Sequence, residues 1–173
     1  MTVDRSDGVL ILTPFEPGDA QAVLEADRDA EHRRRFEIPA DFVPSIEHAE
    51  RVVERWSRDF EAGTSYAFAA RHLASGELVG GCEVRRLGDA TGNLSYWTYP
   101  AHRGQGYATR AARIAVAFAY AELDLRRIEL VTDLDNAASR RIASTLGFVE
   151  RGERDRQGLH VLERAVGPEV RDR

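Results

Sequence analysis

The chain has 173 residues, 43% of them hydrophobic, which is enough to build one domain with a core of its own. Its formal net charge of −5 argues against non-specific binding to the phosphates of nucleic acids. All 24 of its Lys and Arg residues are arginines. The lack of lysine excludes a Walker A loop, a pyridoxal Schiff base and a protein kinase site, each of which needs that side chain.

Two further features limit the class of protein. No stretch approaches the roughly 18 apolar residues of a membrane span, and no apolar segment follows Met1–Arg5 as it would in a secretory signal. Cys82 is the only cysteine, so the chain forms no internal disulfide, and the five dispersed histidines show no metal-ligand spacing. We therefore predict a cytoplasmic protein with no metal site and with no nucleic-acid or membrane partner.

Hydrophobic periodicity and turn residues divide the chain into alternating elements. In chain order they are a strand at 9–12, a helix from 17 to about 30, a loop over the basic segment 32–44, a helix from 45 to 60, strands at 65–71, 77–85 and 93–99, a helix at 111–123 behind a glycine-bearing turn, a strand at 127–132, a helix at 136–146, and strands at 148–153 and 160–164. Asp19 and Ser45 are the candidate N-caps of the first two helices. Early helices, an antiparallel meander and then mixed units indicate a single α+β domain over residues 1–173.

The most informative segment is the turn Gly104-Gln105-Gly106, which lies between the strand at 93–99 and the long apolar helix. A glycine-bearing turn that opens a helix points several unpaired N–H groups the same way, beside the positive end of the helix dipole, and such a place binds phosphate. A dinucleotide fingerprint fits less well, because its third glycine position is Thr109 and too little chain follows for a six-stranded nucleotide domain. An ordinary strand-to-helix turn is the simpler alternative.

Three motifs in the same order along the chain narrow the choice. Arg103–Ala108 fits R-x-x-G-x-A, Asn136 to Ser139 fits N-x-x-S, and Leu146-Gly147-Phe148 ends the following helix. Together with Tyr96–Pro100, these motifs resemble the GNAT acyltransferase superfamily, and within it the RimJ/RimL-like branch. The resemblance implies a GNAT fold, in which a central, mostly antiparallel sheet is splayed at the cofactor site and carries helices on both faces. It also implies acetyl-CoA as cosubstrate and a primary amine, on a protein N-terminus or a small molecule, as acceptor.

The resemblance assigns the coenzyme to the turn and to the elements on either side of it. The N–H groups of the turn would hold the pyrophosphate, the glycines allow the backbone to approach closely, and Arg103 adds a charge-assisted contact. The peptide-like pantetheine arm would pair with the edge of the strand before the turn. The predicted coenzyme-binding residues are Trp97, Thr98, Tyr99, Arg103, Gly104, Gln105, Gly106, Tyr107, Ala108, Thr109, Asn136 and Ser139.

Direct acyl transfer needs a neutral amine, a polarised thioester carbonyl and a proton for the departing thiolate. The resemblance gives that last role to Ser139, one turn along the helix from Asn136, although an N-cap and an exposed serine are the plainer interpretation. Glu83 is the predicted general base, with Asp89 and Glu129 as alternatives. Each of the three also reads as an ordinary surface carboxylate, which is the commoner case.

Several alternatives stay open at this level. A non-catalytic acyl-CoA-binding or regulatory domain would keep the same glycine turn, and succinyl-CoA would fit it as well as acetyl-CoA. The family shapes its acceptor site in the first helix-to-helix loop, where Arg33-Arg34-Arg35 lies, but this segment carries no readable code for one acceptor. Many family members are dimers, and a homodimer is compatible with this sequence.

Overall fold

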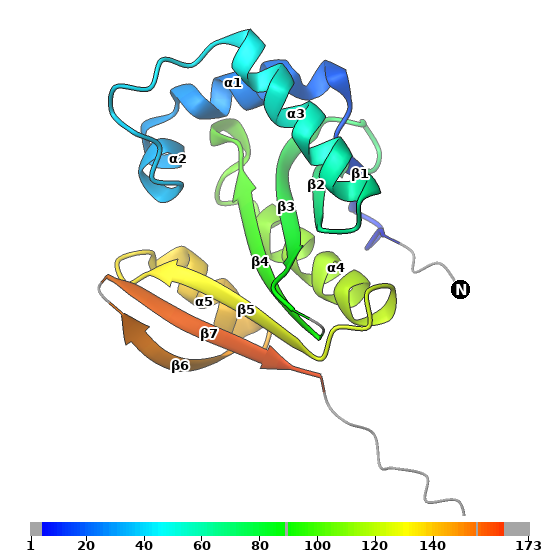
Figure 1. Cartoon of the computed structure of the whole chain (residues 1–173), viewed down its shortest axis with the longest axis vertical. Helices are drawn as coiled ribbons and strands as arrows, with labels where there is room; N and C mark the ends of the chain where they lie inside the picture. The colour runs from blue at the N-terminus through cyan, green and yellow to red at the C-terminus, as the bar shows by residue number, and fades with distance from the viewer. Residues whose placement is uncertain (1–4, 89, 155, 165–173) are drawn as a thin grey trace, which may run out of the picture.

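The computed structural model describes residues 5–88, 90–154 and 156–164 (Figure 1). Its elements are, in chain order, β1 (Leu10–Pro14), the 3-10 turn η1 (Pro17–Asp19), α1 (Ala20–Arg28), α2 (Ala30–Arg35), α3 (Ile46–Glu61), β2 (Ser65–His72), β3 (Leu78–Arg86), β4 (Thr91–Thr98), the 3-10 turn η2 (Pro100–His102), α4 (Tyr107–Ala121), β5 (Arg127–Asp133), α5 (Ala137–Thr145), β6 (Val149–Arg154) and β7 (Gln157–Glu163). The described strands form a seven-stranded sheet in the order β1-β2-β3-β4-β5-β7-β6. The architecture is α+β, as predicted.

The centre of the sheet is the one place where its strands run parallel. All other neighbouring pairs are antiparallel, whereas β4 and β5 run in the same direction. These two strands pair only through residues 91–93 and 127–129 and then diverge toward α2 (Figure 1). Beyond this point the backbone N–H and C=O groups of β4 have no ladder partner on the β5 side. The predicted splay is confirmed.

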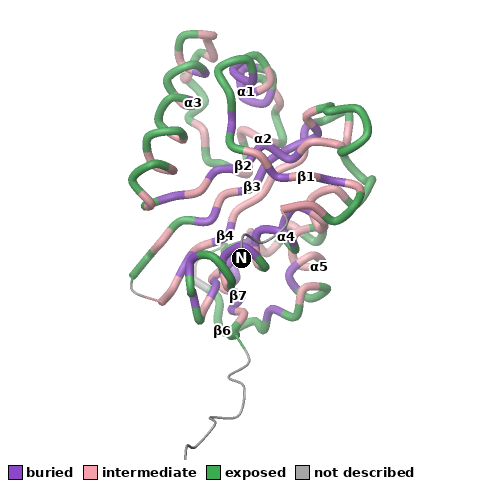
Figure 2. Tube along the Cα trace, turned by 90° about the vertical axis from the view of Figure 1, so that its right-hand side faces the viewer, coloured by how far each residue is buried: buried purple, intermediate pink, exposed green. Residues whose placement is uncertain are grey.

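Helices cover both faces of the sheet, as predicted. α1 and α3 lie on one face, where Val53 of α3 is buried with Ala69 of β2. α4 lies on the other face, and its Phe118 ring packs against Phe68 with ring centroids 5.1 Å apart. The buried stretches accordingly run along the central strands and the inner side of α4 (Figure 2). Among the helices of the described ranges, none has both the length and the apolar character needed to cross a bilayer.

Most predicted elements are confirmed with small shifts at their ends, but the basic segment was wrongly predicted to be a loop. Residues 30–35 form the helix α2, because Asp29 caps it by accepting the His32 N–H at 2.8 Å. The helix has no buried residue, so the apolar spacing that reveals other helices is absent from it. Ser45 caps α3 as predicted. Asp19 does not cap α1; its carboxylate accepts the Glu16 backbone N–H in the capping box of η1 and pairs with the Arg71 guanidinium at 2.6 Å.

Candidate active site

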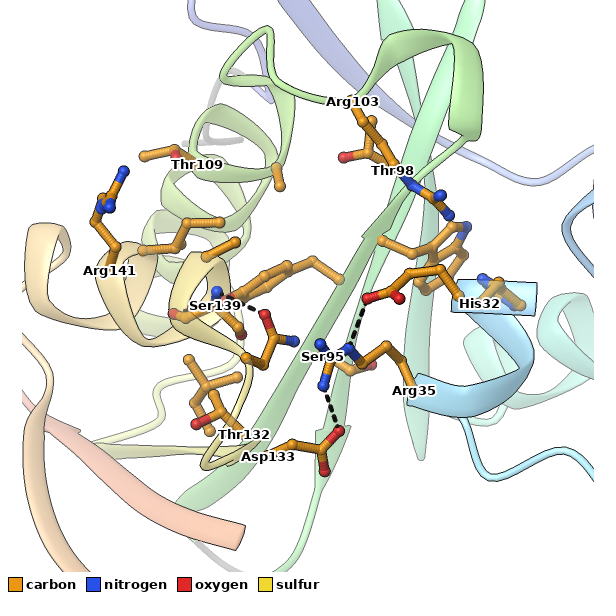
Figure 3. Close-up of a pocket in the computed structure, with 18 of the residues that line it drawn as sticks. His32, Arg35, Ser95, Thr98, Arg103, Thr109, Thr132, Asp133, Ser139 and Arg141 are labelled. Atoms are coloured by element: carbon orange, nitrogen blue, oxygen red, sulfur yellow. Dashed lines mark hydrogen bonds and ion pairs between the residues drawn. The ribbon is translucent and has the colours of Figure 1, made fainter. Parts of the chain in front are cut away.

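A cleft of about 510 Å³ opens where β4 and β5 separate. It is lined by the end of β4, the glycine turn with the start of α4, the end of β5, the first turns of α5, and α2 (Figure 3). The splay thus brings together segments that are far apart in the sequence. The predicted coenzyme-binding residues that line the cleft are Trp97, Thr98, Arg103, Gly104, Gly106, Tyr107, Ala108, Thr109, Asn136 and Ser139.

The glycine turn lies at the N-terminus of α4. Gly104 and Gly106 have φ values of +75° and +80°, a left-handed conformation that other residues adopt only with strain, and no atom lies within 4 Å of an added Cβ at either position. Within the described part of the chain, the backbone N–H groups of residues 104–109 donate to no other group, and α4 has no side-chain cap. A row of free N–H groups facing open space at a helix N-terminus fits a pyrophosphate.

Arg103 lines the same cleft, but its guanidinium is bound to α2. Both terminal nitrogens face the carboxylate of Asp29, with Nη1 3.4 Å from Oδ2 and Nη2 donating to Oδ1. This hydrogen-bonded pair holds the pKa of Asp29 below its usual range. The side chain of Arg103 therefore lies beside α2 and not over the N–H row of the glycine turn.

Ser139 lies in the first turn of α5, facing β4. Its Oγ is 2.8 Å from the hydroxyl of Tyr96, and its backbone N–H donates to Asn136 Oδ1 at 3.0 Å. Asn136 is thus the N-cap of α5, as its plainer interpretation predicted, and it also lines the cleft. Burial raises the pKa of Tyr96 to about 12, so the phenol keeps its proton near neutral pH and holds the Ser139 hydroxyl in place.

Three predicted site residues do not line the cleft. Glu83 lies on β3, one strand away from the splay, and its carboxylate accepts a hydrogen bond from Ser65 in a separate pocket beside α3. Tyr99 is only 8% exposed, and Gln105 turns its amide toward the Ala101 carbonyl. Alternate side chains of a strand point to opposite faces, and the sequence did not assign those faces. Glu83 is therefore not brought to the site that it was predicted to serve.

Glu129 and Cys82 lie outside the cleft. Glu129 pairs with Arg127 at 3.0 Å on β5 and does not line the cleft, and Asp89 lies outside the described residues. Cys82 is fully buried against α4, and burial raises the pKa of its thiol. A buried thiol that keeps its proton is not a nucleophile, and Cys82 is a small side chain of the hydrophobic core.

Arg141 is a cleft residue that sequence reasoning missed. It lies on α5 at the edge of the cleft, beside Thr109 of α4 (Figure 3). Its guanidinium has no ion pair within the described residues. Helical spacing could not have found it, because Arg141 is two residues after Ser139 and five after Asn136, and neither spacing places two residues on one helix face. An unpaired cation beside the glycine turn adds to the suitability of this end for an anion.

The wall opposite α5 was also missed, because it is formed by α2. This helix contributes Glu31, His32 and Arg35 to the cleft, and Phe36, which directly follows it, also lines the cleft. Burial is the main reason that the pKa of His32 falls to about 4, with Asp29 opposing and Arg103 assisting the shift, so the imidazole is neutral at pH 7. The neutral ring packs against Phe36, whose edge in turn meets the ring of Trp97.

Charged groups of the α2 wall pair across the cleft with the end of β5. Arg35 Nη1 is 2.9 Å from Asp133 Oδ2, and its Nε is 2.8 Å from Glu31 Oε1 (Figure 3). Arg34 and Arg35 both bind Asp135, and Arg34 is the main reason that the pKa of Asp135 falls to about 2. Of this network only Glu31, Arg35 and Asp133 line the cleft, so the cleft is offered the carboxylate oxygens of Glu31 and Asp133, which suit an ammonium group.

Comparison with known proteins decides the family. A family model described as "Acetyltransferase (GNAT) domain" matches residues 9–149, which run from β1 to the start of β6. The chain belongs to the GNAT acetyltransferase family. The prediction made from the three motifs is confirmed at the level of the family, and with it the N-acetyltransferase class of enzyme.

Individual relatives of this GNAT chain agree in class. It is 28% identical to YdaF of Bacillus subtilis, named a ribosomal N-acetyltransferase, over 122 residues that cover 66% of this chain and 62% of YdaF, which is less than two thirds of that protein. It is 28% identical to YjcK of the same organism, named an N-acetyltransferase, over 150 residues that cover 83% of this chain and 82% of YjcK. The solved structure of RimL, a ribosomal L7/L12 alpha-N-protein acetyltransferase in complex with coenzyme A, matches with a TM-score of 0.76 at 17% identity, covering 92% of this chain and 96% of RimL. At that identity the likeness to RimL shows the fold alone.

Proposed function

We propose that this GNAT chain transfers the acetyl group of acetyl-CoA to a primary amine by direct attack of the amine on the thioester. The observation that carries the proposal is that the free N–H row at the start of α4 opens onto the same cleft as the Ser139 hydroxyl. A phosphate anchor and a proton donor beside one free strand edge suit a coenzyme A thioester. Acetyl-CoA supplies the activated acetyl group, and the residues of the chain bind, orient and exchange protons.

The donor would be held by the glycine turn, β4 and α5. The N–H groups of residues 104–109 would bind the pyrophosphate, and Arg141 would add a charge-assisted contact. Residues 95–98 of β4 lie beyond the last pairing with β5, so their backbone groups are available to the amide-containing arm, much as to an added strand. A backbone N–H near Trp97 or Thr98 would polarise the thioester carbonyl.

Proton movements are assigned to groups that line the cleft. Attack by the amine forms a C–N bond and breaks the C–S bond. The thiolate would take a proton from Ser139 Oγ, and a proton from solvent, which also takes up the proton released by the amine, would restore the serine hydroxyl. Tyr96, 2.8 Å from that oxygen, orients the hydroxyl. The acceptor loses its proton on the side where Glu31 and Asp133 line the cleft. An amine whose pKa is lowered by partial desolvation would need no stronger base than these.

For the acceptor we propose a protein N-terminus, with a small polyamine as the alternative. The names of YdaF and RimL support the first choice. The carboxylates of Glu31 and Asp133, which line the cleft beside Arg35, support an acceptor that brings an ammonium group. We further expect this protein to act in a reducing cytoplasm, given its single cysteine, and a homodimer stays a prediction of the resemblance.

Release of free thiol from acetyl-CoA tests the proposal. The acceptor panel contains hexapeptides that begin with serine, alanine or methionine, together with spermidine. We expect turnover with at least one of these amines and at least about a tenfold loss of kcat in Ser139→Ala. Succinyl-CoA, run in parallel, distinguishes the acyl donors. Coenzyme A binding without turnover on any acceptor would instead identify a non-catalytic acyl-CoA-binding domain.

A further inference from the structure

α2 is a helix that its own residues do not stabilise. It has six residues, none of them buried, and isolated helices of this length do not form in water. It nevertheless supplies three side chains to the cleft, on the side opposite Ser139, and Phe36 directly after it supplies a fourth. The position of the acceptor wall therefore depends on what holds α2 at its two ends.

Both ends of α2 are held by ion pairs to the segments that flank the cleft. At the N-terminal end, the Asp29 carboxylate accepts the His32 N–H and also faces both terminal nitrogens of Arg103, in the glycine turn. At the C-terminal end, Arg35 binds Asp133 and Asp135, the residues that lead into α5. The helix thus lies across the opening between β4 and β5, with one end at the glycine turn and the other at the segment between β5 and α5 (Figures 1 and 3).

We propose that Arg103 is a positioning residue for the acceptor, which acts through Asp29 on α2, and that it is not a ligand of the coenzyme pyrophosphate. The inference rests on the proposed function, because it assigns the acceptor to the α2 side of the cleft. The free N–H row of residues 104–109 needs no side chain of Arg103 to bind an anion. The guanidinium of Arg103 is paired with Asp29 and is not available to the pyrophosphate. Arg141, unpaired within the described residues, lies at the edge of the same cleft and supplies a positive charge there.

Asp29→Asn separates the two roles of Arg103. Asparagine caps a helix as well as aspartate does, so the substitution keeps the cap of α2 and removes only the charge of the pair. We expect the Kd for coenzyme A to stay within about twofold of wild type, and the amides of residues 30–36 to exchange hydrogen about two- to fivefold faster, the range given by a partly exposed ion pair. If Arg103 were a phosphate ligand restrained by Asp29, Asp29→Asn would free it and coenzyme A would bind more tightly. That result would overturn the proposal.

Arg103→Gln and Arg141→Gln form a matched pair, since each removes one guanidinium from the cleft. Calorimetric titration should show that Arg103→Gln lowers the affinity for coenzyme A by less than about threefold and that Arg141→Gln lowers it more. Steady-state kinetics with the serine-initiated hexapeptide or spermidine should show a raised acceptor KM in Asp29→Asn and Arg103→Gln, with kcat changed less. The proposal would be contradicted if Arg103→Gln lost more affinity for coenzyme A than Arg141→Gln. It would also be contradicted if the amides of α2 exchanged hydrogen at the wild-type rate in Asp29→Asn. Failure of the proposed function would look different: wild type would bind coenzyme A without acetylating either amine, and the binding and exchange results would still decide the role of Arg103.

Discussion

Gly106 lies where the proposed phosphate site meets the start of α4. Its φ of +80° is in the left-handed region, and an added Cβ would meet no atom within 4 Å. In Gly106→Ala the left-handed alanine costs about 1–2 kcal/mol, and the reduced freedom of the unfolded chain offsets about 0.4–1 kcal/mol of that. We therefore expect the free energy of unfolding to fall by about 1 kcal/mol, which lowers Tm by about 2–4 °C in a chain of 173 residues.

The same methyl group would enter the space in front of the N–H row, where a phosphate oxygen would bind. The Kd for coenzyme A, measured by calorimetric titration, should rise at least about tenfold, or about 1.4 kcal/mol. Gly76→Ala is the control, because Gly76 lies in the turn between β2 and β3 with a φ of +73°, equally open surroundings and no place in the cleft. It should lose similar stability and keep wild-type affinity. Wild-type affinity in Gly106→Ala would refute the phosphate site. If Gly106→Ala and Gly76→Ala lost the same affinity for coenzyme A, the loss would reflect general destabilisation of the fold and not a phosphate site at Gly106.

Three further predictions concern other groups of the cleft. Tyr96→Phe removes the hydroxyl that bonds Ser139, so urea unfolding should show a loss of about 1 kcal/mol in the free energy of unfolding. In steady-state kinetics kcat should fall more than KM changes. An unchanged kcat would show that Tyr96 has no part in proton transfer. Arg141→Gln should weaken coenzyme A about three- to tenfold at low salt and less at high salt, and titrations at two ionic strengths that gave equal ratios would argue against an ionic contact. The ordinary pKa of His32 is 6.5, and the fold lowers it to about 4, so folding favours the neutral imidazole. The contribution of His32 to the stability of the folded protein is therefore complete above pH 6.5 and is lost as the pH falls toward 4. Between pH 7 and pH 4 the wild type should therefore lose about 1–2 kcal/mol more than His32→Gln, after allowance for partial exposure; parallel unfolding curves for the two proteins would contradict this.

The features that sequence reasoning predicted well are those set by the backbone. A glycine turn before a long apolar helix predicts unpaired N–H groups, and the structure has them in residues 104–109. Asn136 predicts an N-cap, and it caps α5. Such local features depend on residues within one turn of each other, so a single sequence contains most of what determines them.

The features that were missed depend on contacts across the sheet. Whether Glu83 or Tyr99 reaches the cleft depends on which face of its strand it occupies, and that is fixed by register with neighbouring strands. Asp29 caps α2 locally, but two of its arginines are neutralised by residues about a hundred positions away, because Arg34 and Arg35 bind Asp133 and Asp135. No pattern within residues 30–35 contains that information.

The aromatic cluster at the cleft has an optical consequence. Trp56 and Trp97 are the only two tryptophans of the chain, and their rings stack with centroids 5.7 Å apart. Phe15 packs against both indoles, and Phe36, next to the C-terminal end of α2, meets Trp97 edge-on at 5.9 Å. All the indole fluorescence of the protein, and the indole part of its near-ultraviolet circular dichroism, therefore originates at one place, on the α2 side of the cleft. The tryptophan fluorescence of unlabelled protein therefore reports movements at Phe36, because the chain has no third tryptophan that would add a signal from another place.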